Sequence, residues 1–165
     1  MSDGQNEKRA VSLAERASSS GGRVIVGPLR RPPLVYRAAA AGVIAATDPA
    51  WLVDDPGLWK AVSDGALRML VSSSGRPPSL GTLYRSGPAR GLASLETLAA
   101  LIASRPAALL GCSSKGLLSP GRHGDLCLLE AAGGKTTARL TLLRGSNVYR
   151  PHGRLMLAEP AEGFV

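Results

Sequence analysis

Short apolar runs alternate with amphipathic stretches through the middle of the chain. The β-branched or apolar runs at 23–26 (RVIV), 42–47 (GVIAAT) and 66–73 (ALRMLVSS) are typical of buried strands. The stretches between and after them follow a helical period, and they predict helices at 34–42, 54–65, 94–104 and 105–111. Strands that alternate with helices in this way predict parallel βαβ units and an α/β fold class.

Helix boundaries are marked by residues with a defined capping role. Pro56 lies in the first turn of its predicted helix, and Gly65 follows the end of that helix. Ser94 is placed to cap the helix at 94–104, with Glu96 in the electropositive first turn. Gly42 is expected to end the helix that begins at Leu34.

The pattern changes after Gly111, where helical periodicity stops. Four short strands separated by turns are predicted, at 124–130, 138–145, 147–153 and 154–159. The turn between the last two strands is expected at His152-Gly153. Residues 1–22 are polar, end in SSSGG and are expected to be a flexible lead-in. The predicted organisation is therefore a lead-in at 1–22, a βα segment at 23–111 and a small β-rich segment at 112–165.

Composition narrows the class of protein without naming a function. The 165 residues are 44% hydrophobic, so the chain can bury a core, but no apolar run is long enough to span a bilayer. No secretory signal is recognised at the N-terminus, and two cysteines are too few for a disulfide framework, so a cytoplasmic location is expected. The formal net charge is +8, but the basic residues are scattered and aromatics make up only 4%, a pattern that does not favour nucleic-acid binding.

An ordered string of dipeptides in the second half resembles the amidohydrolase superfamily. The string runs where that superfamily passes from its metal-dependent TIM barrel to its β-sandwich domain, and it comprises Pro106-Ala107, Leu110-Gly111, Lys115-Gly116, Pro120-Gly121 and Asp125-Leu126. The resemblance implies a partial (β/α) TIM-barrel-like segment followed by a small β-sheet like the β-sandwich domain. Because several barrel strands would be missing, the barrel is not expected to close.

The closing residues resemble one branch of that superfamily, the hydantoinases and dihydropyrimidinases with their non-enzymatic relatives. The matching positions are Arg144-Gly145, Val148-Tyr149, Gly153 and Gly163-Phe164. The segment upstream, at 55–79, is shared with allantoinases and dihydroorotases, so these two groups remain open.

The resemblance implies a metal-dependent cyclic amidase, but the ligands that it requires are absent from the sequence. Such enzymes use zinc or another divalent metal, held by histidines, a lysine and an aspartate that also acts as general base. The aspartate position falls on Ser74, or on Ser73 with a slip of one residue, and a serine hydroxyl is a poor ligand and a poor base. Gly27 stands where a later histidine belongs, and no His-x-His occurs. We therefore expect no catalytic residue, no metal site and no cofactor.

Other candidate chemistry is no stronger. The Gly133-Gly134-Lys135 run lacks the full phosphate-binding pattern, and neither Ser73 nor Ser74 has a partner base. Cys112 and Cys127 are interpreted as small hydrophobes. His123 is interpreted as a solvated turn residue, and Asp125 as an acceptor of backbone N–H bonds within its turn.

Two functions of different class follow. The first is a degenerate, non-catalytic homologue that acts by association, either with itself or with a related amidohydrolase subunit. This hypothesis expects strand residues without their usual barrel neighbours, namely Val24, Ile25, Val43, Ile44, Leu70 and Val71. The second is a partial subunit or fragment of a metal-dependent cyclic amidase, a hydrolase of non-peptide C–N bonds, completed by another chain.

Overall fold

The chain forms two compact units. The computed structural model describes residues 3–73, 75, 78–132 and 135–150. The first unit comprises Met1–Leu117 and the second Leu118–Val165. The division therefore falls a few residues after the predicted boundary at 111/112.

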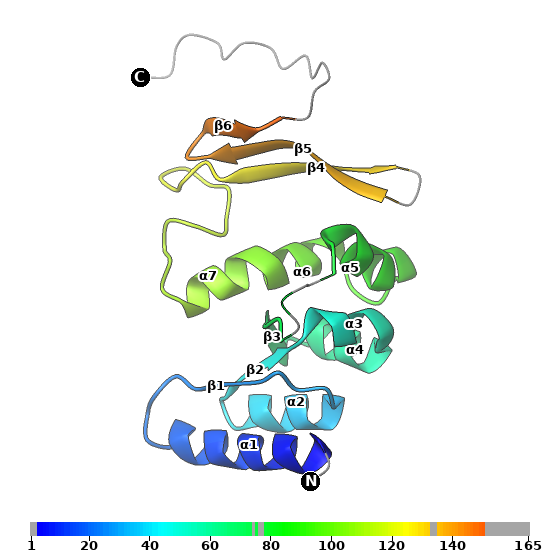
Figure 1. Ribbon diagram of the computed structural model, residues 1–165. Coiled ribbons are helices and arrows are strands. Elements are labelled where there is room, and N and C mark those ends of the chain that lie inside the picture. Colours follow the sequence, from blue (N-terminus) through cyan, green and yellow to red (C-terminus); the bar gives the residue numbers. More distant parts are fainter. Residues whose placement is uncertain (1–2, 74, 76–77, 133–134, 151–165) are drawn as a thin grey trace. The chain divides into compact units, whose positions relative to one another are not determined.

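The sheet of the first unit is parallel, as the alternating pattern predicted. Strand β2 (Ile44–Thr47) lies between β1 (Ile25–Val26) and β3 (Leu67–Leu70), and it pairs in parallel with both (Figure 1). Neighbours in the sheet are thus neighbours in the sequence. In the described part of the first unit, helices and strands alternate, and the three strands form an open parallel sheet and not a closed barrel.

Helices connect and follow the strands. Helix α2 (Pro32–Ala40) joins β1 to β2, and α3 (Pro49–Asp54) and α4 (Pro56–Ser63) join β2 to β3. The helical segments after β3 are α5 (Leu80–Ser86), η1 (Pro88–Arg90), α6 (Leu95–Ala99), η2 (Ala100–Ser104) and α7 (Arg105–Leu109). The predictions for α2, α4 and α6 are confirmed, including Ser94, whose hydroxyl accepts the N–H of Thr97 at 3.1 Å. Helices α3 and α5 were not predicted.

The helix predicted at 105–111 is not separate from its predecessor. Segment η2 is a π-helix that links α6 to α7 without a loop. Pro106 has no N–H to give to an α-helical bond, and the wider π turn lies immediately before it. The proline therefore follows a change in helical winding instead of starting a new element.

The N-terminus differs most from the sequence prediction. Residues predicted as a flexible lead-in form helix α1 (Asp3–Ser18), which lies alongside α2 (Figure 1). Val11 is 0% exposed and joins the hydrophobic core. The Glu15 carboxylate accepts hydrogen bonds from two guanidinium nitrogens of Arg37, both at 2.6 Å. The structure differs from the prediction because Val11 and Ala14, although they are few, lie on one buried face of the helix.

The core of the first unit is aliphatic with one large aromatic ring. Its fully buried side chains include Trp59, Leu29, Leu52, Leu58, Leu67, Leu101, Val11, Val35 and Val62. The Trp59 ring packs directly on Gly87, where an added Cβ would lie 2.5 Å from the ring. Each buried aliphatic side chain of this size contributes roughly 1.5–3 kcal/mol.

The second unit is an antiparallel sheet. Strand β5 (Lys135–Leu143) pairs with β4 (Leu126–Ala132) and with β6 (Ser146–Tyr149). Arg144 and Gly145 form the two-residue turn between β5 and β6, both with positive φ (51° and 79°), as a type I′ hairpin requires. The strand predicted at 154–159 and the turn at His152-Gly153 lie outside the described residues.

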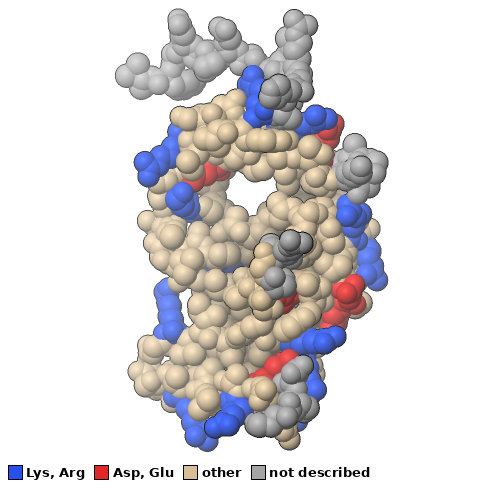
Figure 2. All heavy atoms as spheres, in the orientation of Figure 1, with Lys and Arg blue, Asp and Glu red and all other residues tan. Residues whose placement is uncertain are grey.

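On the face seen in Figure 2, the described basic residues do not gather into one stripe. Figure 2 shows Lys and Arg side chains dispersed over the visible face, separated by neutral surface. Among the residues that the structure describes, no helix combines the length and the apolar character needed to cross a membrane.

Candidate functional site

The candidate site lies where the parallel strands of the first unit end. Gly27 follows β1, Asp48 follows β2, and the segment from Val71 to Ser73 follows β3. In parallel α/β sheets, ligands bind outside the carboxyl ends of the strands. The residues at this edge therefore decide what chemistry the unit can perform.

Asp48 is the buried carboxylate of this edge, and it is only 1% exposed. Its Oδ1 atom accepts the N–H of Ala50 at 2.8 Å, which caps helix α3. Its Oδ2 atom accepts both the N–H of Ser73 at 2.7 Å and the hydroxyl of Ser73 at 2.5 Å. We call Asp48 and these three donors the Asp48 cluster.

The Asp48 cluster favours the ionised carboxylate. Burial alone would raise the pKa of Asp48, but the hydrogen bonds from the Ser73 hydroxyl, the Ser73 N–H and the Ala50 N–H outweigh it and hold that pKa below its usual value. A carboxylate with a lowered pKa and occupied oxygens is a weak general base. Asp48 is thus suited to structure and poorly suited to proton abstraction.

Ser73 serves as a donor within this cluster. It is exposed, and its hydroxyl donates to Asp48, whose lowered pKa makes that carboxylate too weak a base to activate Ser73 as a nucleophile. Ser74, the other position for the aspartate that the resemblance implies, lies outside the described residues.

Gly27 leaves no space for a ligand side chain. A Cβ built on Gly27 would lie 2.7 Å from the carbonyl oxygen of Ala46, a backbone atom of the neighbouring strand. Thr47, the last residue of β2, connects this strand to the segment after β1, because its hydroxyl donates to the Leu29 carbonyl at 2.7 Å. A histidine at position 27 would therefore require the backbone of β1 or β2 to shift.

The described residues of this edge do not form a donor set that fits a divalent metal. A protein site needs three or four ligands held together. Within the described ranges, no three residues of the His, Cys, Asp and Glu types lie close enough to hold a metal ion. His152 lies outside those ranges, and His123 belongs to the second unit.

The remaining candidates have positions that suggest structural roles. Asp125 accepts the backbone N–H of Arg144, in the β5–β6 turn, at 2.8 Å. His123 is half-buried, and its Nδ1 atom is buried without a hydrogen-bond partner among the described residues. Cys112 and Cys127, interpreted as small hydrophobes, are both free and exposed.

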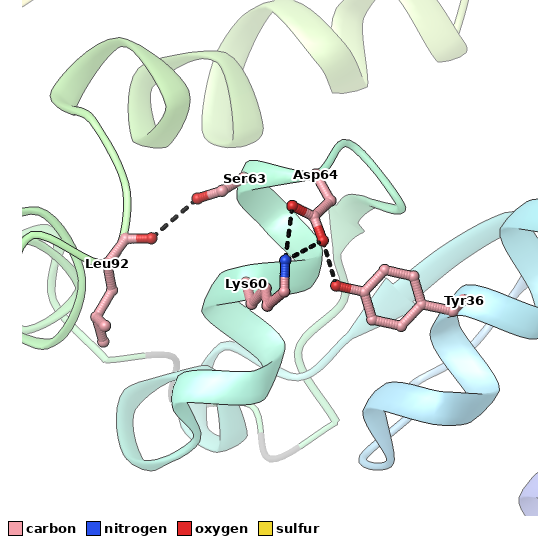
Figure 3. A network of polar contacts seen from close by, with 5 residues as sticks. All are labelled: Tyr36, Lys60, Ser63, Asp64 and Leu92. Carbon is pink, nitrogen blue, oxygen red and sulfur yellow. Dashed lines mark hydrogen bonds and ion pairs between the residues drawn. The ribbon is translucent and has the colours of Figure 1, made fainter.

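A second polar network lies near the start of β3, away from the strand ends (Figure 3). The hydroxyl of Tyr36 donates to Asp64 Oδ2 at 2.6 Å, and the ammonium of Lys60 reaches the same oxygen at 2.8 Å. The Ser63 hydroxyl donates to the Leu92 carbonyl at 2.9 Å. This network joins α2 to α4 and connects α4 to the chain that precedes α6.

The network predicts a pH-dependent contribution to stability. The hydrogen bonds from Lys60 and from Tyr36 lower the pKa of Asp64, and the bond to Asp64 raises the pKa of Tyr36 and of Lys60. A carboxylate with a lowered folded pKa stabilises the fold above its unfolded pKa, about 3.9. That contribution is lost as the pH falls through the folded pKa. The raised pKa values of Tyr36 and Lys60 give a contribution lost above pH about 10.

We therefore expect Asp64→Asn to destabilise the chain by a constant amount between pH about 5 and 9, and by less below pH about 4. Urea unfolding at a series of pH values measures this difference. Asp54→Asn, at an exposed aspartate of α3, is the control and should show no such pH-dependent gap. A difference between wild type and Asp64→Asn that persists undiminished at pH 2.5 would contradict the assignment.

Comparison with known proteins gives structural matches only. No family model matches the chain, and no curated protein matches it. An L-hydantoinase (dihydropyrimidinase) from Arthrobacter aurescens matches with a TM-score of 0.66 and 21% identity, over 87% of this chain and 48% of that one. A dihydropyrimidinase from Brevibacillus agri NCHU1002 matches with a TM-score of 0.69 and 19% identity, over 89% and 48% respectively.

A D-hydantoinase from a Bacillus sp. AR9 matches similarly, with a TM-score of 0.67 and 17% identity over 90% of this chain and 49% of that one. At such identities, the likeness establishes the fold. The resemblance to hydantoinases and dihydropyrimidinases is thus confirmed at the level of fold, and the chain spans about half the length of the solved structures that it matches.

The sequence reasoning missed Asp48, although a signal was present. Asp48 stands between the apolar strand and Pro49, and an aspartate directly before a proline is typical of a helix N-cap. Its second role, as acceptor for Ser73, joins positions 25 residues apart and has no local signal.

Proposed function

We propose that this chain is a partial, non-catalytic amidohydrolase-like protein, a pseudoenzyme, that acts by association with another polypeptide chain. The observation that carries the proposal is that the residues at the carboxyl ends of the strands are engaged within the fold and leave no space for a metal ligand. The carboxylate there, Asp48, has both oxygens engaged within the fold, and Gly27 has no room for a ligand. A metal-dependent hydrolase needs an open coordination site and a free base at this place.

The partial TIM-barrel reading belongs to the same proposal. Three parallel strands in chain order, each followed by helix, are the repeating unit of that barrel, and a closed barrel needs eight strands. The match to about half of each hydantoinase supports this reading. A cytoplasmic location is proposed with it, since the two free cysteines suit a reducing compartment.

Exposed apolar side chains support association. Ile25 on β1 is 46% exposed, and Val71 directly after β3 is 36% exposed, so both edge strands present apolar surface. Two residues expected to lack neighbours, Val43 and Ile44, are instead buried. The apolar surface that these strands offer for association is therefore smaller than the sequence suggested.

The test is direct. We expect the purified chain to hold no stoichiometric zinc and to leave hydantoin, dihydrouracil, allantoin and dihydroorotate unhydrolysed, because its described residues hold no set of three metal ligands and Asp48 is a weak base. Elemental analysis and product assays measure both. Light scattering of the same sample at micromolar concentration should show a mass above the 17.0 kDa of one chain.

Two results would contradict the proposal. One is a tightly held metal at about one ion per chain, with hydrolysis that is lost on chelation. The other is a monodisperse 17.0 kDa species with a cooperative melt, which would show that the chain needs no partner.

A second candidate is a partial subunit that completes a metal site with another chain. It is favoured by the coverage, since the missing half of the matched hydantoinases could be supplied in trans. In that case, metal and activity would appear only in a mixture with a second, complementary chain. Activity of such a mixture that survives Asp48→Ala would exclude Asp48 from the shared site.

A further inference from the structure

The end of the β2–β3 ladder shows what the Asp48 side chain does. The last described backbone bond between these strands runs from the Val71 N–H to the Thr47 carbonyl at 2.9 Å. In a parallel ladder the next donor on the same side is the N–H two residues later, that of Ser73, and its acceptor would be the carbonyl of residue 49. Pro49 begins helix α3, so the backbone turns away before it can accept that bond.

The Asp48 carboxylate takes over this acceptor position. Its Oδ2 atom accepts the Ser73 N–H at 2.7 Å and the Ser73 hydroxyl as well, while Oδ1 accepts the Ala50 N–H at the start of α3. One buried side chain therefore joins three elements: the end of β2, the start of α3 and the segment after β3. Charge-assisted hydrogen bonds of this kind are about twice as strong as neutral ones.

We propose that the Asp48 cluster is what holds the carboxyl ends of β2 and β3 together, without any metal ion. The inference does not rest on the proposed function, because it concerns how this edge is built and not what the edge catalyses. It assigns Asp48 and Ser73 a structural role, in place of the ligand role that the family resemblance would give a residue near position 73.

The test compares Ser73→Ala with Ser72→Ala in the full-length chain. Ser72 is exposed like its neighbour, and its side chain makes no hydrogen bond within the described residues, so it is a matched control. Both tryptophans, Trp51 and Trp59, belong to the first unit, so tryptophan fluorescence follows the melting of that unit alone.

We expect Ser73→Ala to lower the melting temperature by about 4–8 °C and Ser72→Ala to change it by less than about 2 °C. Asp48→Asn should lower it at least as much as Ser73→Ala. Neither EDTA nor added zinc should shift the melting temperature of the wild type.

Amide exchange gives a second readout, at the level of a single N–H group. In the wild type, the Ser73 N–H should exchange slowly with solvent. In Asp48→Asn, the same N–H should exchange about tenfold faster or more. Equal melting of Ser73→Ala and Ser72→Ala, together with an unprotected Ser73 amide, would overturn the proposal. A wild-type melting temperature that falls on chelation, with Asp48→Asn insensitive to chelator, would overturn it too, because the edge would then be held by metal.

Discussion

Replacing Trp59 by alanine is expected to lower the free energy of unfolding of the first unit by about 3–5 kcal/mol. Trp59 is 0% exposed, is the largest side chain of the core and packs on Gly87. Its removal would leave a cavity that the surrounding aliphatic residues cannot fill without moving. Denaturant unfolding followed by circular dichroism measures the loss, and Trp51 remains as a fluorescent reporter of the same unit.

Trp59→Phe is the matched control for this effect. The indole N–H of Trp59 finds no acceptor among the described residues, so replacing the indole by a phenyl ring removes no hydrogen bond and keeps most of the apolar contact. Because the phenyl ring is smaller than the indole, a small cavity remains, and we expect a cost of about 1–2 kcal/mol, well below that of alanine. A loss for Trp59→Phe as large as that for Trp59→Ala would show that the N–H has an unrecognised acceptor.

Helix α1 should prove necessary for the stability of the first unit. Val11→Asp places an unpaired carboxylate at a position that is 0% exposed, and it is expected to lower the free energy of unfolding by roughly 3–5 kcal/mol. The reason is that Val11 is part of the same core as the sheet and α2. Thermal melting followed by the fluorescence of Trp51 and Trp59, which lie outside α1, measures this effect.

Leu13→Asp controls for the introduction of charge into α1. Leu13 is 57% exposed on the same helix, so its substitution should change stability by no more than about 0.5 kcal/mol. Equal and small effects of both substitutions would mean that α1 does not pack on the core. The original expectation of a flexible lead-in would then be restored.

The elements that the sequence predicted are those with strong local signals. The runs around β2 and β3 are apolar and bounded by turn residues, and Ser94 is followed by a glutamate and a leucine stripe. Helix α1 was missed because polar residues dominate its sequence, so no apolar period is visible. The helix is stabilised by tertiary packing, and only the structure shows that Val11 is part of the core. Helix α3 was missed because six residues are too few to show a period.

The sequence shows which ligand residues of the family are missing from the candidate site, but it does not show the Asp48 cluster that the site contains. The absence of His-x-His and of an aspartate near Ser73 can be read directly from the sequence. The cluster that is present depends on the chain turning at Pro49 and bringing Ser73 to Asp48, a contact between distant positions. Likewise, only the backbone distance to Ala46 reveals that Gly27 has no space for a side chain.

The order of strands in the first sheet also bears on how the chain folds. Because β2 pairs with the strand before it and with the strand after it, each pairing closes a single βα connection. Each pairing therefore closes only one helical connection, and the entropy lost in closing it is offset by burial of the helix between the two strands. During synthesis, β2 and α2 can therefore dock on β1 before β3 has left the ribosome, and the growing sheet need not wait for a distant segment.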